Sequence, residues 1–248
     1  MSALAVSIRN LDFHYPGSDV LLYHNLDLHI KAGERFGLFG PNGAGKTTLM
    51  SLMTGLIEPD KGTISLLGHQ LNANNQDVNK LFGFVPQDFS FYHELSPIEN
   101  LEFFGAWAGL RTSEIKQRTN ELLEILGLSD VRHKPVQKFS GGMKRRINLA
   151  IGVIHRPKVL FLDEPTVGVD VQTRHAIISY LEQLNREGTT LIYTSHQLNE
   201  AEDLCHEMAL VDNGHIIAQG EIAQLLEQNH QTTLEGLFLN LTGRQYRD

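Results

Sequence analysis

The most informative stretch of this 248-residue sequence reads Gly40-Pro41-Asn42-Gly43-Ala44-Gly45-Lys46-Thr47. It matches the pattern G-x-x-x-x-G-K-[ST] and lies between an apolar run and a segment with helical spacing, the context that the pattern requires. Glycines let the backbone wrap closely around phosphate oxygens, and the amides at a helix start offer donors to an anion. The stretch predicts a phosphate-binding loop, and its context argues against a glycine-rich turn that binds nothing.

The side chains after the glycines predict a nucleoside triphosphate as the ligand of this loop. Lys46 is expected to reach the β- and γ-phosphates, and Thr47 to supply a hydroxyl to Mg²⁺. The predicted ATP contacts of the loop are Gly40, Pro41, Asn42, Gly43, Ala44, Gly45, Lys46, Thr47 and Thr48.

Strand and helix patterns extend outward from the loop in both directions. The run 35–39 before it is apolar, and 46–56 after it carries apolar residues at helical spacing. Alternating or apolar runs predict further strands at 4–13, 21–30, 63–67, 81–85, 159–162 and 189–194. Asn213-Gly214 predicts a tight hairpin turn between 208–211 and 215–218. Residues 172–185 are predicted helical, and 229–248 a polar tail around an amphipathic segment at 234–241.

The middle of the chain has a mainly helical pattern. Ser96-Pro97-Ile98-Glu99 has a helix-starting order, with Ser as N-cap, Pro in the first turn and Glu three residues after the cap. Further helices are predicted at 113–126 and from Gly141 onward. Residues 88–154 therefore form a predicted helical insertion between parts that are richer in strands.

A second group of chemically active residues follows the apolar run 159–162. Asp163 and Glu164 stand where such a run ends, and Pro165 follows them. In a nucleotide hydrolase, one carboxylate at a strand end holds the Mg²⁺ shell and a neighbour orients or deprotonates the attacking water. We expect Asp163 to serve the metal and Glu164 the water. A solvated acidic strand end is the alternative, and the phosphate loop makes it the weaker one.

Composition narrows the classes of protein that fit. With 21 Lys+Arg against 29 Asp+Glu, the net charge is −8, which disfavours a general nucleic-acid binder. Its single cysteine, Cys205, makes neither an intrachain disulfide nor a cysteine metal cluster. The start of the chain lacks a signal-peptide pattern, and no run approaches the roughly 20 apolar residues of a membrane span. Any membrane role is expected to act through a partner.

Several motifs in a fixed order carry a resemblance to a known family. Phe139-Ser140-Gly141-Gly142-Met143 resembles the signature motif of the ABC ATPases and lies between the phosphate loop and the carboxylate pair. Gln87 resembles the Q-loop glutamine, Gly168-Val169-Asp170 the D-loop, and His196 the switch histidine. Tyr15 lies where the family has an adenine-stacking aromatic. The resemblance extends over nearly the whole chain, and six ordered motifs are much more specific than one.

The resemblance implies a role for each of these residues. Ser140, Gly141, Gly142 and Met143 are expected to contact the γ-phosphate held by a second copy, because a helix start attracts an anion. Gln87 would sense the γ-phosphate and contribute with Thr47 and Asp163 to the Mg²⁺ shell. Glu164, His196 and Gln87 form the predicted catalytic group, and Asp170 would link the two sites across the dimer. Taken alone, Tyr15, Gln87 and His196 have ordinary structural explanations, namely a half-buried strand residue, a loop residue and a satisfied polar residue.

The sequence departs from the family pattern at two positions, and two of its segments resemble a subgroup of the family. Met143 replaces the usual signature glutamine, and Val169 replaces the usual D-loop leucine. The run from Ser140 to Arg146 and the C-terminal segment resemble bacterial exporter ATPases for drugs, polysaccharides, lipids or haem. Lys144-Arg145-Arg146 is too short, in an acidic chain, to indicate nucleic-acid binding.

Together these observations predict an α/β P-loop NTPase (RecA-like) core with an antiparallel β subdomain and an inserted α-helical subdomain. The expected ATPase domain spans 1–228, with the core at 1–87 and 155–228, the helical subdomain at 88–154, and a tail at 229–248. Expected cofactors are ATP and Mg²⁺; expected partners are a second copy and a separate transmembrane permease, with no nucleic acid. The expected location is the cytoplasmic face of the plasma (inner) membrane.

The resemblance implies that the chain is the ATP-hydrolysing motor subunit of a membrane ABC transporter of the exporter type. Two other functions remain open at this level. A soluble ABC ATPase acting on ribosomes or DNA usually carries two ATPase domains or a long coiled-coil insertion, and neither is visible. An inactive nucleotide-binding regulator is disfavoured by the intact Lys46, Asp163, Glu164 and His196.

The segment 89–104 includes Phe89, Phe91, Tyr92, Leu95 and Leu101, which suit either a groove for a partner helix or the core of the insertion. The sequence does not indicate the transported substrate.

Overall fold

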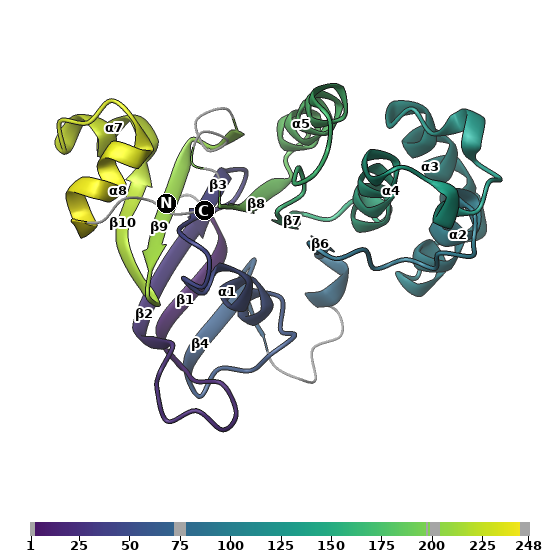
Figure 1. Cartoon of the computed structure of the whole chain (residues 1–248). Helices are drawn as coiled ribbons and strands as arrows, with labels where there is room; N and C mark the ends of the chain where they lie inside the picture. The colour runs from purple at the N-terminus through teal and green to yellow at the C-terminus, as the bar shows by residue number, and fades with distance from the viewer. Residues whose placement is uncertain (1–2, 72–77, 197, 199–203, 244–248) are drawn as a thin grey trace. The chain divides into compact units, whose positions relative to one another are not determined.

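The computed structural model describes residues 3–71, 78–196, 198 and 204–243 (Figure 1). The packing of the backbone divides the chain into two compact units. The first unit comprises residues 1–79 and 190–248, and the second comprises residues 80–189. The expected subdomain boundaries at 87/88 and 154/155 stay a prediction.

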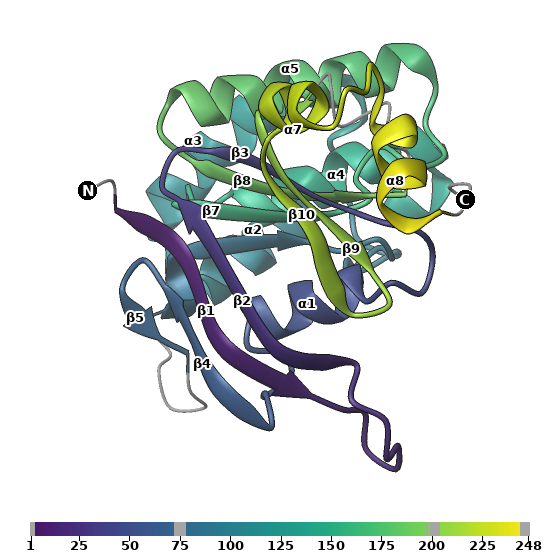
Figure 2. The same cartoon turned by 90° about the vertical axis from the view of Figure 1, so that its left-hand side faces the viewer.

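The first unit contains an antiparallel sheet whose strand order is β2-β1-β4-β5 (Figure 2). Its strands are β1 (Leu4–Phe13), β2 (Tyr23–Lys31), β4 (Lys61–Leu66) and β5 (His69–Gln70). In the centre of the sheet, Ile8 pairs with Leu28 on one side and Ile64 on the other. These three side chains are buried, so the alternation read from the sequence has become one apolar sheet face.

A second group of strands in the same unit includes β3, the strand that leads into the glycine-rich loop. β3 (Arg35–Phe39) lies between β8 (Thr190–Ser195) and β9 (Glu207–Asp212) and runs parallel to both. β10 (His215–Glu221) returns antiparallel to β9, which confirms the predicted hairpin. Nearly every residue of β3 and β8 is buried, as expected for parallel strands covered on both faces. The chain leaves β3 through the glycine-rich loop and enters α1 (Lys46–Met53).

The second unit combines two parallel strands with helices. β6 (Phe82–Val85) pairs with β7 (Val159–Asp163). The helices are α2 (Pro97–Trp107), α3 (Thr112–Ile125), α4 (Gly141–Val153) and α5 (Val171–Arg186), with short 3₁₀ turns at Ser129–Val131 and Val136–Lys138. The predicted cap of α2 is confirmed, because the Ser96 side chain accepts from the Glu99 amide while the Glu99 carboxylate accepts from the Ser96 amide.

The sequence-based boundaries differ from the structure in a few places. α1 ends at Met53 rather than Leu56, because Gly55 takes a φ of 71° that ends the helical hydrogen-bond pattern. α7 (Ile222–Gln228) was not predicted, and the amphipathic segment of the tail forms α8 (Leu234–Thr242). α8 packs on α7 and buries Leu234, Leu237 and Phe238. Within the described ranges, no helix has the length and apolarity needed to cross a membrane.

Candidate functional site

The loop between β3 and α1 has a backbone that only glycine adopts without strain at two positions. Gly40 has a φ of 154°, and a Cβ added there would collide with the main-chain oxygen of Val211. Gly45, the residue before α1, has a φ of 109°, and a Cβ there would collide with the Tyr23 hydroxyl. These conformations curl the main chain around the start of α1, where amides point outward and attract an anion.

Lys46 lies inside this curl rather than in solvent. Its side chain is buried, with only 6% of the residue exposed. The Lys46 ammonium donates to the carbonyl oxygens of Gly40 at 2.7 Å and Pro41 at 3.0 Å. The loop therefore already concentrates a positive charge at its centre, next to the amides that would receive phosphate oxygens.

Tyr23 of β2 supports the glycine-rich loop through a hydrogen bond. The sequence pattern did not indicate this role. Its hydroxyl donates to the carbonyl oxygen of Gly45 at 2.6 Å, and burial raises the pKa of this hydroxyl well above its usual value. The β9–β10 hairpin adds a second support, because the Gly214 amide donates to the carbonyl oxygen of Ala44 at 3.2 Å. A buried tyrosine in an alternating strand carries no signal that separates this role from simple packing.

Tyr15 lies beside the same helix start. It is 51% exposed, and its hydroxyl is 2.5 Å from the hydroxyl of Thr48 in α1. The Phe13 ring contacts it edge to face, with the two ring centroids 5.3 Å apart. An exposed aromatic face next to a phosphate loop suits stacking against a flat, electron-poor ring such as adenine.

The backbone just before Tyr15 is held by two contacts between His14 and Asp60. The Asp60 carboxylate accepts from the His14 amide at 2.7 Å and lies 2.6 Å from Nδ1 of the His14 ring. The hydrogen bond from the His14 side chain is the main cause that lowers the pKa of Asp60. Asp60 thus fixes the segment that carries Tyr15, and no short motif in the sequence indicated this contact.

In the second unit, the two carboxylates at the end of β7 are buried. Asp163 is 3% exposed and Glu164 is 8% exposed. The Glu164 backbone has a φ of 49°, in the left-handed region that a residue with a long side chain seldom occupies. Gln87 comes close to it: Nε2 of Gln87 donates to Oε2 of Glu164 at 2.9 Å. The structure therefore brings together two predicted site residues that are far apart in sequence.

The signature motif forms the exposed start of α4. Ser140 is the N-cap of this helix and accepts from the Met143 amide at 3.3 Å, and both Ser140 and Gly141 are exposed. A Cβ on Gly142 would lie 3.0 Å from the Thr173 hydroxyl, so glycine permits the close approach of α4 to the start of α5. An exposed N-terminus of a 13-residue helix can receive an anion.

Asp170 occupies the start of α5. Its carboxylate accepts from the Thr173 amide at 2.9 Å and from the Thr173 hydroxyl at 2.8 Å. The hydrogen bond from the Thr173 amide is the first cause that lowers the pKa of Asp170. Asp170 is thus an N-cap of α5 in this structure.

The predicted residues fall into two groups. The first unit holds Tyr15, the loop 40–48 and His196, which directly follows β8. The second unit holds Gln87, the signature residues 140–143, the Asp163-Glu164 pair and Asp170. The predicted metal ligands Thr47, Gln87 and Asp163 offer hydroxyl, amide and carboxylate oxygens, the hard donors that fit Mg²⁺.

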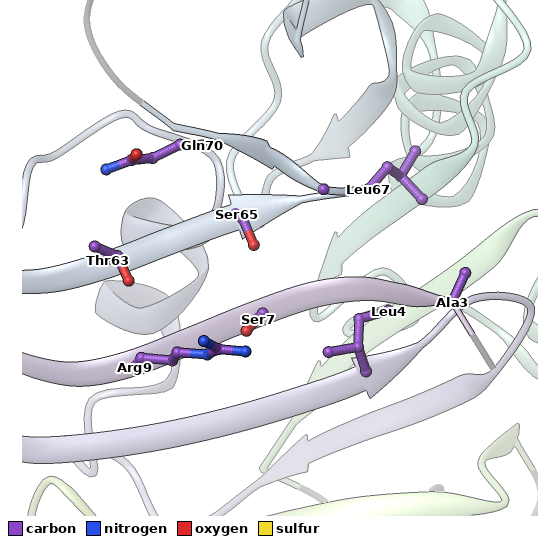
Figure 3. A pocket seen from close by; sticks show the side chains of 9 residues that line it. Ala3, Leu4, Ser7, Arg9, Thr63, Ser65, Leu67 and Gln70 are labelled. Atoms are coloured by element: carbon purple, nitrogen blue, oxygen red, sulfur yellow. The ribbon is translucent and has the colours of Figure 1, made fainter. Parts of the chain in front are cut away.

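A separate depression of about 520 Å³ lies on the antiparallel sheet of the first unit (Figure 3). Ser7 and Arg9 of β1 line it together with Thr63 and Ser65 of β4 and Gln70 of β5. None of the predicted site residues is among its lining residues.

Comparison with known proteins agrees with this geometry. The family model described as "ABC transporter" matches residues 23–167. The chain belongs to the ABC transporter family of ATPases. This confirms the resemblance and the fold class predicted from the motifs.

Curated relatives in the ABC family have names linked to export or resistance. The chain is 43% identical over 195 residues to the linearmycin resistance ATP-binding protein LnrL of Bacillus subtilis, an alignment that covers 79% of this chain and 63% of LnrL. It is 39% identical over 209 residues to the Nod factor export ATP-binding protein I of Cupriavidus metallidurans, covering 84% of this chain and 69% of that protein.

Solved ABC structures have the same fold. An ATP-binding subunit of an ABC transporter superposes with a TM-score of 0.88 at 26% identity, covering 96% of this chain and 99% of the other. A dimeric ATP-binding cassette in a post-hydrolysis state with ADP and Pi superposes with a TM-score of 0.78 at 25% identity, covering 88% of this chain and 98% of the other.

Proposed function

We propose that this chain is the ATP-hydrolysing motor subunit of a membrane exporter, and that two copies close head to tail around two ATP molecules. The names of its relatives, one for linearmycin resistance and one for Nod factor export, support an export role. The dimeric cassette with ADP and Pi supports a dimer as the hydrolysing form. In this proposal the chain acts at the cytoplasmic face of the membrane through a separate transmembrane subunit.

One contact carries the catalytic part of the proposal, the hydrogen bond from Gln87 to Glu164. Glu164 would orient and deprotonate the water that attacks the γ-phosphate, and the carboxylate is already held by an amide that belongs to the same site. Lys46 and the loop amides would bind the phosphates, Tyr15 would stack on adenine, and His196 would hydrogen-bond the γ-phosphate. When bound, Mg²⁺ would neutralise phosphate charge, held by Thr47, Gln87 and Asp163.

The exposed start of α4 supports the proposed role of a second copy in ATP binding. Ser140 and Gly141 face solvent, so their helix end is available to the γ-phosphate bound by a partner. Neither anion site alone would encircle the triphosphate. Hydrolysis would remove the shared γ-phosphate and let the dimer open, with Asp170 linking the two sites.

The variant Glu164→Gln tests this proposal. It keeps the size of the side chain but removes the carboxylate base, so we expect ATP to bind and remain intact. Size-exclusion chromatography with light scattering should then give a dimer with ATP and a monomer without nucleotide. The matched control is the double variant Glu164→Gln/Ser140→Arg, whose bulk and charge should keep it monomeric with ATP. A Glu164→Gln protein that hydrolyses at the wild-type rate, or stays monomeric at saturating ATP, contradicts the proposal.

The membrane subunit would dock on an aromatic patch of the second unit, formed by Tyr92, Phe103 and Trp107. These side chains are 47%, 45% and 80% exposed, and the ring centroids of Tyr92 and Phe103 are 4.9 Å apart. Within the predicted segment 89–104, Phe91 and Leu101 are instead buried and belong to the core. Exposed aromatic side chains are typical anchors of protein interfaces.

Binding to permease-containing membranes tests this patch. Tyr92→Glu with Trp107→Ser should reduce co-sedimentation with the membranes and leave ATP binding by the isolated chain unchanged. Leu56→Ser, which alters an exposed apolar residue of the first unit, is the matched control. Equal co-sedimentation of all three proteins would exclude the patch as the docking surface.

A further inference from the structure

Arg145 is a buried arginine on the helix that begins with the signature motif. The residue is 6% exposed, although a guanidinium carries a permanent charge and five donors. Burying such a group is unfavourable unless hydrogen bonds and charges compensate it. The hydrogen bonds and charges around the guanidinium therefore indicate the role of Arg145.

The Arg145 guanidinium reaches two loops that carry predicted site residues. One terminal nitrogen donates to the Gln87 main-chain oxygen at 2.8 Å, and the other is 3.5 Å from the Val167 main-chain oxygen. The guanidinium carbon also lies 4.9 Å from the centroid of the Phe89 ring, within cation–π range. One side chain of α4 thus holds the residues on both sides of Asp88 and the turn that follows Glu164.

The negative charges near the Arg145 guanidinium also favour its placement beside these loops. Burial lowers the pKa of Arg145, and Glu164, Asp88 and Asp163 act in the opposite direction as negative neighbours. Arginine keeps its proton in proteins, so a fixed positive charge faces these carboxylates.

A second residue of α4 holds the same segment. Nδ2 of Asn148 donates to the Pro86 main-chain oxygen at 3.1 Å, and its side-chain oxygen accepts from the Ser90 amide at 3.4 Å. Asn148 is 2% exposed and lies three residues after Arg145, on the same helix face. The segment 86–90 is therefore attached to α4 at three main-chain groups.

We infer that Arg145 is a positioning residue that fixes Gln87 and the turn carrying Glu164 to the signature helix, so that the Gln87 amide meets the Glu164 carboxylate. This inference rests on the proposed roles of Gln87 and Glu164. The connected path runs from α4 through Arg145 to the Gln87 main chain and from the Gln87 side chain to Glu164. The Val167 amide also donates to the Glu164 main-chain oxygen at 3.3 Å, so Arg145 reaches the turn of Glu164 a second time through the Val167 main-chain oxygen. A shift of the signature helix would thereby reach the hydrolytic carboxylate of the same copy.

Arg118 provides a matched comparison within the same unit. It is 7% exposed and donates to the main-chain oxygens of Val153 at 3.2 Å and Ile154 at 3.4 Å, at the other end of α4. Both arginines are buried and fasten α4 through main-chain oxygens, but only Arg145 contacts the segment of Gln87. A purely structural role predicts similar effects for the two positions, whereas positioning predicts different ones.

Steady-state hydrolysis and ATP binding by the full chain separate these cases. Arg145→Met should lower kcat about 10- to 100-fold, because misplaced catalytic groups slow the reaction without weakening ATP binding. The KM and the Kd for ATP should stay within about twofold, because the hydrogen bonds of Arg145 go to residues of the second unit, whereas the phosphate loop belongs to the first. Arg145→Lys should give an intermediate kcat, because one donor can still reach the Gln87 oxygen. Arg118→Met should lower the Tm but leave the kcat of the folded protein near the wild-type value.

A double variant tests whether Arg145 acts through Gln87. In the Gln87→Ala background, Arg145→Met should lower kcat by less than about twofold further, because effects on one path are not additive. Full additivity, or a kcat of Arg145→Lys and Arg145→Met that matches Arg118→Met, overturns the inference. Glu164→Gln is measured in parallel: if it turns over ATP like the wild type, the proposed role of Glu164 fails. If it is inactive while Arg145→Met stays active, only the inference about Arg145 fails.

Discussion

Two parts of the proposed ATPase machinery are the loop from Gly40 to Lys46 and the pair of Gln87 and Glu164. Different interactions hold these two parts in position. The loop is shaped by its own backbone, with left-handed glycines and a lysine that binds carbonyls five and six residues back. Gln87 and Glu164 are 77 residues apart, and α4 holds the Gln87 segment through Arg145 and Asn148. The first site is local in sequence, and the second depends on tertiary packing.

This difference implies that binding and hydrolysis respond to separate substitutions. Changes in the loop and its supports should act on ATP affinity. Changes around Arg145 should act on turnover. Substitutions in the first unit test the local site, and those at Glu164 and Arg145 test the site that depends on tertiary packing.

The largest effect is expected for Lys46→Ala. A charge-assisted phosphate contact contributes about 1.5–3 kcal/mol, so the affinity for ATP should fall about 10- to 100-fold. Isothermal titration calorimetry with Mg·ATP measures this loss, and Lys61→Ala, at an exposed lysine of the same unit, is the control. If Lys46→Ala retains wild-type affinity, the loop does not bind the phosphates as proposed.

Tyr23→Phe should have a smaller effect on the same loop. It removes the donor to the Gly45 oxygen and should lower the free energy of unfolding by about 1 kcal/mol. ATP affinity should fall a few-fold, because the loop before α1 loses a support. Tyr180→Phe deletes a buried hydroxyl in the second unit and should leave ATP affinity unchanged. Equal ATP affinities for the two variants and the wild type would show that Tyr23 serves packing alone.

Asp60→Asn should have the smallest effect, and it depends on pH. The hydrogen bond from His14 lowers the pKa of Asp60, so its contribution to stability is present above the ordinary carboxyl pKa of 3.8 and is lost as pH falls through the lower folded-state value. The Tm of Asp60→Asn should therefore lie a few degrees at most below wild type at neutral pH. Thermal unfolding at decreasing pH should show the two curves converging below pH 3.8. A gap that widens on acidification would contradict this assignment.

Much of the secondary structure could be predicted because it rests on local patterns. β1 and β3 have the predicted bounds, and Ser96 caps α2 as its spacing with Glu99 indicated. α7 was missed because its 7 residues are too few to show a clear helical period in the sequence. Its neighbour α8 coincides with the amphipathic segment expected at 234–241, and it buries Leu234, Leu237 and Phe238.

By itself, the sequence determined the phosphate loop, the carboxylate pair and the order of the family motifs. These depend on residue types at fixed short spacings, where glycine backbone freedom and helix-end charge act within one turn. Only the tertiary structure decided that Tyr23 and Gly214 support the loop, that Asp60 holds His14, and that Arg145 joins the Gln87 segment to α4. Such contacts join residues distant in the chain, and their energies come from burial and hydrogen bonds that no local pattern records.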